Sequence, residues 1–262
     1  MSEGKNVIEV KNLRAVVHEE GQDITLLHDS SFVVREGESL GILGESGSGK
    51  STTGRVLAGL LKPDSGAVLI EGEDVYAGSK GREHLRNRLS IVFQDYTTSA
   101  NPRFTIRRVI GEGIAVGARK TGEKIDYAEE TARLLRLVGL DESFAKRFPH
   151  ELSGGRLQRV CIARAIACRS ELILFDEAVS SLDAHTQVQI MDLLLNLKEK
   201  LGLTYIFITH DLTSITYFCS RVIFLKDGSV VADSPVSELS KLDVPYAKEL
   251  LGAVLDFNAE SA

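Results

Sequence analysis

The residues with the clearest chemistry form one short run, Gly44-Glu45-Ser46-Gly47-Ser48-Gly49-Lys50-Ser51, which has the pattern G-x-x-x-x-G-K-[ST]. Glycines let such a loop curl so that successive N–H groups point inward, and the N-terminus of a following helix adds partial positive charge. An apolar run precedes the loop and a helix-compatible run follows it, which argues against a chance match. The sequence therefore predicts a phosphate-binding loop, in which Lys50 reaches the β- and γ-phosphates, Ser51 holds Mg²⁺ and Thr52 adds to the binding set.

An acidic pair follows a second apolar run, Leu172-Ile173-Leu174-Phe175. A carboxylate at the end of a buried strand can hold the Mg²⁺ shell of a nucleotide, and this is the role expected of Asp176. Glu177 is next in line to orient or deprotonate an attacking water. Because strands often end in acids, the pair indicates phosphoryl transfer only together with the phosphate loop upstream.

A second loop of small residues has the sequence Leu152-Ser153-Gly154-Gly155-Arg156 and precedes a helical run over residues 156–168. Ser153 is expected to cap that helix. Such a loop at a helix N-terminus can bind a second phosphate group. One nucleotide does not need two such loops, but two chains arranged head to tail would each supply one half of a shared site. The alternative is a capped helix start without a ligand.

The elements around these motifs alternate between strands and helices. Short apolar or alternating runs predict strands, whereas residues 95–148 show helical spacing and no strand pattern. Asp227-Gly228 predicts a tight hairpin between two strands near the end of the chain. The expected strands cover residues 7–17, 24–35, 39–43, 67–70, 89–93, 172–175, 204–209, 221–226 and 229–233, and the helices of the insertion cover 106–118 and 127–138. The chain is therefore predicted to be an α/β protein with an inserted helical segment.

Composition argues against several classes of protein. The 262 residues carry a net charge of −6, whereas nucleic-acid binders usually show a basic stripe. No apolar run approaches the length that spans a bilayer and no secretory signal pattern opens the sequence, so any link to a membrane is expected to go through a partner. The three cysteines show no pairing pattern, which suggests a reducing compartment. Cys161 and Cys168 are interpreted as small buried hydrophobic residues.

With these motifs in this order, the sequence resembles the ATP-binding subunits of ABC transporters over nearly its whole length. Residues 44–51 resemble their Walker A motif, 152–156 their signature and 172–177 their Walker B motif. Gln94 is similar to the Q-loop glutamine, Asp183 to the D-loop aspartate and His210 to the switch histidine. The resemblance implies an ATPase with a RecA-like P-loop NTPase core, an antiparallel β-subdomain and an inserted α-helical subdomain.

The resemblance also implies roles and partners. ATP would lie between Walker A of one subunit and Ser153, Gly154, Gly155 and Asp183 of a second ATP-binding subunit, which would be either a different chain or another copy. Gln94 would sense the γ-phosphate, join the Mg²⁺ shell and signal through the helical insertion, and His210 would contact the γ-phosphate. Two transmembrane permeases and an extracytoplasmic substrate-binding protein would complete an importer. The chain would then lie on the cytoplasmic face of a bacterial inner membrane, with no nucleic-acid partner.

Finer motifs are similar to those of the peptide/nickel importer branch. They are Phe93-Gln94-Asp95 with Asn101-Pro102-Arg103, Phe148-Pro149-His150-Glu151, and Val244-Pro245-Tyr246. Residues 159–165 and 176–180 look most like the second ATPase of nickel importers. The resemblance implies uptake of nickel, another metal complex or an oligopeptide. Because the permeases and the binding protein choose the cargo, these residues do not separate the three.

Two positions depart from the family pattern. Arg156 stands where glutamine is commoner, which is a mild change. The family's base-stacking aromatic residue is missing, since its position falls near Val17 and the nearest flat side chain is His18. Strand alternation puts Val17 and His18 on opposite faces, so we expect Val17 to contact adenine and the discrimination between ATP and GTP to be weak.

Two other classes of protein share some of these motifs. A soluble ABC-type ATPase acting on ribosomes or DNA usually carries two cassettes or a long coiled coil, whereas this insertion has no sustained heptads. A P-loop kinase or GTPase would lack the signature loop and His210. We predict a single nucleotide-binding domain over residues 1–262. Its core is expected in 1–94 and 165–240, the helical insertion in 95–164 and a C-terminal helical tail in 241–262.

Overall fold

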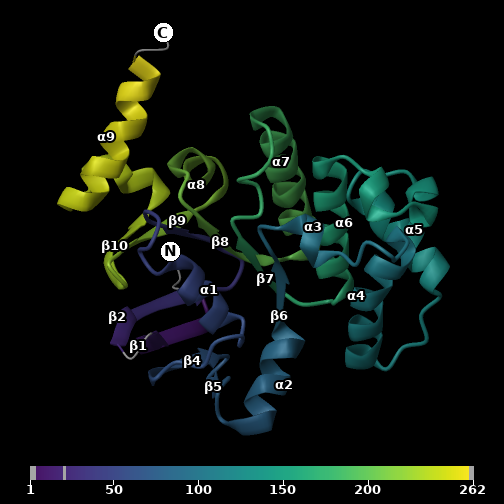
Figure 1. Ribbon diagram of the computed structural model, residues 1–262, viewed down its shortest axis with the longest axis horizontal. Helices are drawn as coiled ribbons and strands as arrows, with labels where there is room; N and C mark the ends of the chain where they lie inside the picture. The colour runs from purple at the N-terminus through teal and green to yellow at the C-terminus, as the bar shows by residue number, and fades with distance from the viewer. Residues whose placement is uncertain (1–3, 20–21, 260–262) are drawn as a thin grey trace. The chain divides into compact units, whose positions relative to one another are not determined.

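The computed structural model describes residues 4–19 and 22–259, with side chains for 4–17 and 22–252 (Figure 1). Its internal contacts divide the chain into two compact units. The first comprises Met1–Arg86 with Leu203–Ala262, and the second comprises Asn87–Gly202. Each unit has buried apolar side chains of its own, such as Ile42 and Phe207 in the first and Ile110 and Leu194 in the second.

The first unit begins with an antiparallel sheet of strand order β2-β1-β4-β5. Two long strands, β1 (Asn6–Glu19) and β2 (Gln22–Arg35), form a hairpin, and β4 (Ser65–Ile70) with the short β5 (Glu73–Asp74) extend the sheet beyond β1. Register shifts interrupt the β1–β2 ladder between Val10 and Val16, but the pairs are regular from Val16 to Glu19. The alternation expected at Val17 and His18 therefore applies to a regular stretch of backbone.

A second set of strands in this unit carries the predicted phosphate loop. Strand β3 (Ser39–Leu43) is parallel to β8 (Thr204–Thr209) on one side and to β9 (Arg221–Lys226) on the other, and β10 (Ser229–Pro235) returns antiparallel to β9. Every residue of β3 and β8 is buried, as continuous apolar runs in a parallel sheet require. The predicted hairpin at Asp227-Gly228 is confirmed.

Helices follow these strands along the chain. The helical elements here are α1 (Lys50–Leu57), α8 (Leu212–Phe218), the 3₁₀ turn η3 (Val236–Lys241) and α9 (Pro245–Ala259). Helix α2 (Gly78–Arg88) leads into the second unit. For residues 78–88 the sequence predicts a solvated loop with a short helix, whereas the structure forms a helix over the whole segment. Gly81 and Leu85, four residues apart, are its buried residues, so one narrow apolar contact is enough to order a mostly polar segment.

The second unit contains two parallel strands and a group of helices. The strands are β6 (Leu89–Val92) and β7 (Leu172–Asp176), paired from Leu89 with Leu172 to Val92 with Phe175. The helical elements are α3 (Tyr96–Ser99), α4 (Ile106–Thr121), α5 (Tyr127–Leu137), the 3₁₀ turns η1 (Glu142–Lys146) and η2 (Pro149–Glu151), α6 (Gly154–Ala167) and α7 (Ala184–Leu201). The helices predicted over 106–118 and 127–138 are thereby confirmed, and α3 was not predicted.

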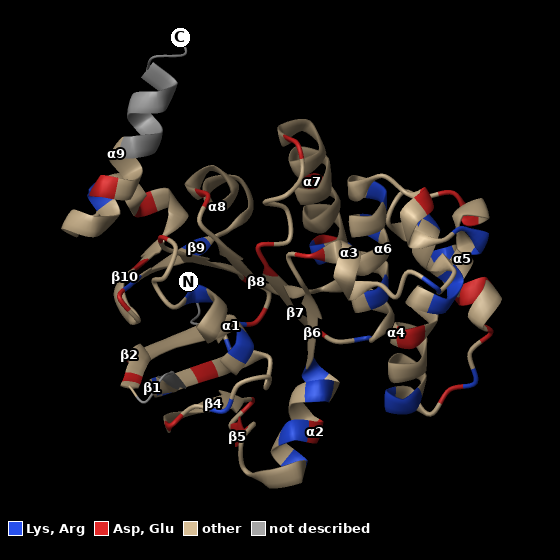
Figure 2. Ribbon diagram, in the orientation of Figure 1, with Lys and Arg blue, Asp and Glu red and all other residues tan. Residues whose placement is uncertain are grey.

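Close contact between helices α4 and α6 holds the helical segment together. A Cβ atom at Gly113 would lie 2.2 Å from the carbonyl oxygen of Arg164, and one at Gly117 would lie 2.4 Å from that of Ala167. Only glycine lets the two backbones approach this closely. Acidic and basic residues both occur along α4 and α5 (Figure 2), and within α5 Arg133 pairs with Glu130 at 2.7 Å. Within residues 4–19 and 22–259, no helix has the length and apolar character needed to cross a bilayer.

Candidate nucleotide-binding site

The predicted phosphate loop connects buried strand β3 to helix α1. Gly47 and Gly49 adopt left-handed backbone conformations, with φ of 84° and 99°, which a residue with a side chain rarely adopts. Glu45, Ser46 and Gly47 are exposed at the tip of the loop, whereas Lys50 keeps only 4% of its surface exposed. The Lys50 ammonium donates hydrogen bonds to the carbonyl oxygens of Gly44 at 2.7 Å and Glu45 at 2.6 Å. The loop is thus folded around its own lysine, with Ser51 exposed at the start of α1.

His210 lies at the same edge of the sheet as the phosphate loop. Leu43, the last residue of β3, pairs with Thr209, the last residue of β8, so the loop and His210 leave neighbouring parallel strands at the same end. Asp211 then starts α8, because its carboxylate accepts the N–H groups of Thr213 and Ser214 at 2.9 and 3.0 Å. His210 itself is exposed, as a residue that contacts a ligand at this edge must be.

The predicted base contact, Val17, lies near the tip of the β1–β2 hairpin. Val17 is half-buried and pairs with Ile24 across the hairpin, so both side chains share one face of the sheet. Ile24 is 43% exposed, an apolar side chain that sequence reasoning did not single out. The side chain of His18 lies outside the described residues.

In the second unit, parallel pairing brings Gln94 to the acidic pair. Strands β6 and β7 end side by side. Gln94 follows the end of β6, and Glu177 follows the end of β7. The Gln94 amide nitrogen donates to the Glu177 carboxylate at 3.3 Å and to the Ser180 hydroxyl at 3.5 Å. Glu177 has a left-handed backbone, with φ of 46°, and Asp176 and Glu177 are both half-buried. A non-glycine residue held at positive φ turns the chain sharply at the strand end, and this turn directs the carboxylate.

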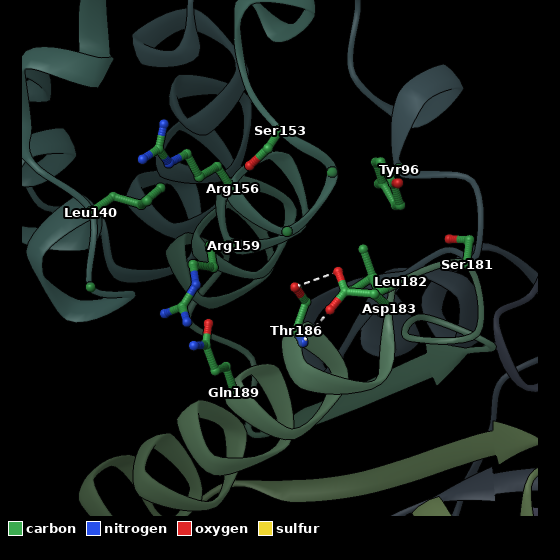
Figure 3. A pocket seen from close by; sticks show the side chains of 13 residues that line it. Tyr96, Leu140, Ser153, Arg156, Arg159, Ser181, Leu182, Asp183, Thr186 and Gln189 are labelled. Carbon is green, nitrogen blue, oxygen red and sulfur yellow. Dashed lines mark hydrogen bonds between the residues drawn. The ribbon is translucent and has the colours of Figure 1, made fainter.

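The signature loop lines a pocket of about 500 Å³ (Figure 3). All of its lining residues belong to the second unit, and most of the named side chains in Figure 3 are polar. The lining residues are Tyr96, Gly139, Leu140, Ser153, Gly154, Gly155, Arg156, Arg159, Ser181, Leu182, Asp183, Thr186 and Gln189. Ser153 occupies the N-cap position of α6 with an extended backbone, but its side chain makes no cap hydrogen bond within the described residues. The predicted N-cap position of Ser153 is therefore confirmed, although its hydroxyl lines the pocket and does not bond the helix N-terminus.

Close packing fixes the shape of this pocket at the two signature glycines. A Cβ atom at Gly154 would lie 2.5 Å from the Tyr96 hydroxyl, and one at Gly155 would lie 2.5 Å from the Thr186 methyl carbon. Thr186 is held in turn by Asp183, whose carboxylate accepts its N–H at 3.0 Å and its hydroxyl at 2.7 Å. These bonds from Thr186 lower the pKa of Asp183, which keeps the carboxylate charged beside the pocket.

Comparison with known proteins identifies the family. Residues 27–180 match the family described as ABC transporter, which is more than half of the chain. The chain belongs to the ABC transporter family. It is 41% identical over 235 residues to the nickel import ATP-binding protein NikE of Rhodospirillum rubrum, covering 88% of this chain and 83% of that protein. It is also 39% identical over 256 residues to the oligopeptide transport ATP-binding protein OppF of Bacillus subtilis, covering 95% of this chain and 83% of that protein. The chain is 43% identical over 228 residues to the metal-staphylopine import system ATP-binding protein CntF of Staphylococcus aureus, covering 87% of this chain and 89% of that protein.

Solved structures of the family share this fold. The dimeric structure of the ATP-binding cassette MJ0796, in a post-hydrolysis state with ADP and phosphate, matches with a TM-score of 0.78 and 30% identity. The match covers 87% of this chain and 98% of that one. CbiO1 from Clostridium perfringens matches with a TM-score of 0.76 and 26% identity over 90% of this chain and 91% of that one. The predicted fold class is confirmed, and the protein is an ABC ATPase that binds ATP and hydrolyses it to ADP and phosphate.

The predicted site residues of this ABC ATPase fall into two groups, one in each unit. The phosphate loop, His210 and Val17 belong to the first, and Gln94, Asp176, Glu177, Asp183 and the signature belong to the second. Sequence reasoning missed Tyr96, Arg159, Thr186 and Gln189 in the pocket. Of these, Arg159 could have been found, because it follows Arg156 by three residues and so shares a face of α6 with it.

Proposed function

We propose that this ABC ATPase is the energy-coupling subunit of an importer that takes up nickel, another metal complex or an oligopeptide. The proposal is supported by relatives whose names state nickel import, metal-staphylopine import and oligopeptide transport, each about 40% identical to this chain. The subunit works at the cytoplasmic face of a bacterial membrane. Two permease subunits carry the cargo across the bilayer, and an extracytoplasmic binding protein delivers it.

ATP in this proposal lies between the phosphate loop of one ATP-binding subunit and the signature of another. The observation that carries it is the pocket of about 500 Å³, which joins Ser153 and Gly154 at the N-terminus of α6 to Asp183 at the N-terminus of α7. Its lining comes entirely from the second unit, so the pocket presents small polar residues and N–H groups to a phosphate supplied from outside that unit. The dimeric state of MJ0796 with ADP and phosphate supports a shared site. The partner subunit is a different chain or a second copy.

In the proposed site, Ser51, Gln94 and Asp176 would hold Mg²⁺. Each offers an oxygen donor, which is the ligand type that Mg²⁺ prefers. Ser51 is exposed at the N-terminus of α1, and Gln94 directs its amide nitrogen to Glu177, which leaves its carbonyl oxygen for the metal. The metal neutralises charge on the phosphates when bound.

The reacting water is oriented by Glu177 in this proposal. Its carboxylate accepts a hydrogen bond from Gln94, and Glu177 directly follows Asp176 at the end of β7. Glu177 acts as general base, Gln94 reports the γ-phosphate to the permeases, and His210 contacts the γ-phosphate. Val17, with Ile24 beside it, provides an apolar contact for adenine.

A substitution in the signature pocket tests the shared site. Ser153→Arg places a long cationic side chain in the pocket, and the matched control Ser143→Arg makes the same change at an exposed serine that does not line it. Both variants are assembled with the permeases and the second ATP-binding subunit, and each ATP-binding subunit is labelled with 8-azido-ATP. Ser153→Arg should suppress labelling and turnover at the site built on the partner's phosphate loop, whereas Ser143→Arg should change neither. Loss of this chain's own nucleotide binding in the isolated monomer would contradict the shared site.

A further inference from the structure

Tyr246 contacts the phosphate loop from a distant part of the sequence. It lies in α9, near the end of the chain, and only 5% of its surface is exposed. Its hydroxyl oxygen accepts the backbone N–H of Glu45 at 3.0 Å. This contact joins the C-terminal helix to the second residue of the loop that binds phosphate.

The Gly44–Glu45 peptide group is held on both of its sides. Its N–H points to Tyr246, and its carbonyl oxygen, on Gly44, accepts the Lys50 ammonium at 2.7 Å. A trans peptide is planar, so its N–H and C=O point in opposite directions and turn together. The orientation of this one plane therefore sets the position of a carbonyl that holds Lys50.

The surroundings of Tyr246 keep the hydroxyl in place. The Lys226 ammonium lies 4.7 Å from the centre of its ring, close enough for a cation–π contact. Burial raises the pKa of Tyr246, the hydrogen bond from the Glu45 N–H lowers it in part, and the carboxylates of Glu45, Asp227 and Glu249 raise it further. Because the net shift is upward, the phenol stays protonated at neutral pH. At the other end of the loop, the Gly228 N–H donates to the Ser48 carbonyl at 3.0 Å. The loop is thus bonded at two points to residues distant in sequence, Tyr246 and Gly228.

We propose that Tyr246 is a positioning residue for the ATPase: by fixing the Gly44–Glu45 peptide plane, it holds Lys50 where the phosphates bind. The C-terminal helix is then part of the nucleotide-binding machinery without contacting the nucleotide. A merely structural tyrosine would fill space and pair with one partly buried N–H, with no effect on Lys50.

The test compares two phenol hydroxyls in the same unit. Tyr246→Phe removes the oxygen that accepts the Glu45 N–H but keeps the ring. Tyr76→Phe is the matched control, because the Tyr76 hydroxyl donates to the carbonyl oxygens of Val56 and Leu61 at the far end of α1, at 2.5 and 2.6 Å. The full chain is titrated with a non-hydrolysable ATP analogue and with the matching GTP analogue, and the melting temperature is measured without nucleotide.

Tyr246→Phe should weaken the binding of both analogues by the same factor, about two- to tenfold, which is the loss expected from one hydrogen bond. Tyr76→Phe should lower the melting temperature and leave both affinities unchanged. In a Lys50→Ala background, Tyr246→Phe should cause no further loss, because the residue through which it acts is gone. The proposal is overturned if Tyr246→Phe leaves affinity unchanged, if Tyr76→Phe weakens binding equally, or if the losses from Tyr246→Phe and Lys50→Ala simply add.

Discussion

Adding one methyl group at Gly155 should damage the signature pocket through a chain of named contacts. The new Cβ atom of Gly155→Ala would lie 2.5 Å from the Thr186 methyl carbon, well inside van der Waals contact. Thr186 cannot turn away without cost, because its hydroxyl donates to Asp183 at 2.7 Å. The substitution therefore either strains the packing or breaks the bond that holds Asp183.

The loss of stability caused by Gly155→Ala follows from three contributions. Overpacking of a tight contact costs about 1–3 kcal/mol, and loss of the hydroxyl bond to Asp183 costs about 1 kcal/mol where the Thr186 side chain rotates instead. Alanine favours the helix over glycine by less than about 1 kcal/mol, which offsets part of the loss. The net loss is about 1–2 kcal/mol, or a fall of roughly 2–8 °C in the melting temperature.

The assay combines thermal melting with a second substitution. Thr186→Ser removes the methyl group that Gly155→Ala would strike and keeps the hydroxyl that Asp183 binds. The double variant Gly155→Ala with Thr186→Ser should therefore recover most of the lost stability. The control is Gly111→Ala in α4, where the new Cβ would meet Tyr127 at an ordinary 3.6 Å. That variant should melt at the same or a higher temperature, because alanine stabilises a helix relative to glycine and no contact is strained.

Two results would refute the reasoning. If Gly155→Ala melts like the unaltered protein, the neighbourhood of Thr186 is softer than the distances indicate. If Gly155→Ala is destabilised but Thr186→Ser does not restore it, the strain lies elsewhere in the pocket. In the assembled transporter, Gly155→Ala should also lower turnover, and the double variant should restore it together with stability.

Three further predictions concern the nucleotide itself. Glu177→Gln should bind ATP but lower turnover by about 10²- to 10⁴-fold, as expected for loss of a general base. Wild-type-like hydrolysis in an assembly that carries this substitution on both ATPases would contradict the role of Glu177 as general base. Lys50→Ala should weaken nucleotide binding in an ATP titration, and it should also lower the nucleotide-free melting temperature, because it removes the ammonium that donates to two loop carbonyls. An unchanged nucleotide-free melting temperature would mean that these bonds add nothing. Val17→Tyr should tighten ATP binding several-fold through ring stacking of about 1 kcal/mol, and His18→Ala should leave the ATP affinity nearly unchanged. If His18→Ala weakens ATP binding and Val17→Tyr does not tighten it, His18 is the residue that stacks on the base.

The role of Lys50 shows where sequence reasoning stopped. The spacing of glycines and lysine predicts the loop, its strand and its helix, because these depend on neighbouring residues alone. The sequence gives no sign that the Lys50 ammonium donates to the carbonyl oxygens of Gly44 and Glu45. A buried ammonium must find acceptors, and the curled loop supplies the nearest ones.

Local pattern determined most of the elements of this protein and the order of its motifs. Continuous apolar runs marked β3, β7 and β8, helical spacing marked α4 and α5, and Asp227-Gly228 marked the β9–β10 hairpin. Each of these signals lies within one stretch of chain, so backbone geometry and side-chain period are enough to read it.

Tertiary structure alone decided which distant residues meet. Gln94 reaches Glu177, Gly154 packs against Tyr96, and Tyr246 bonds the N–H of Glu45 across 201 positions of sequence. No period or motif encodes such pairs, because they depend on strand order, on close approach at glycines and on where the C-terminal helix packs. The sequence determined that this chain binds the phosphates of a nucleotide, and the fold decided what holds the binding loop in place.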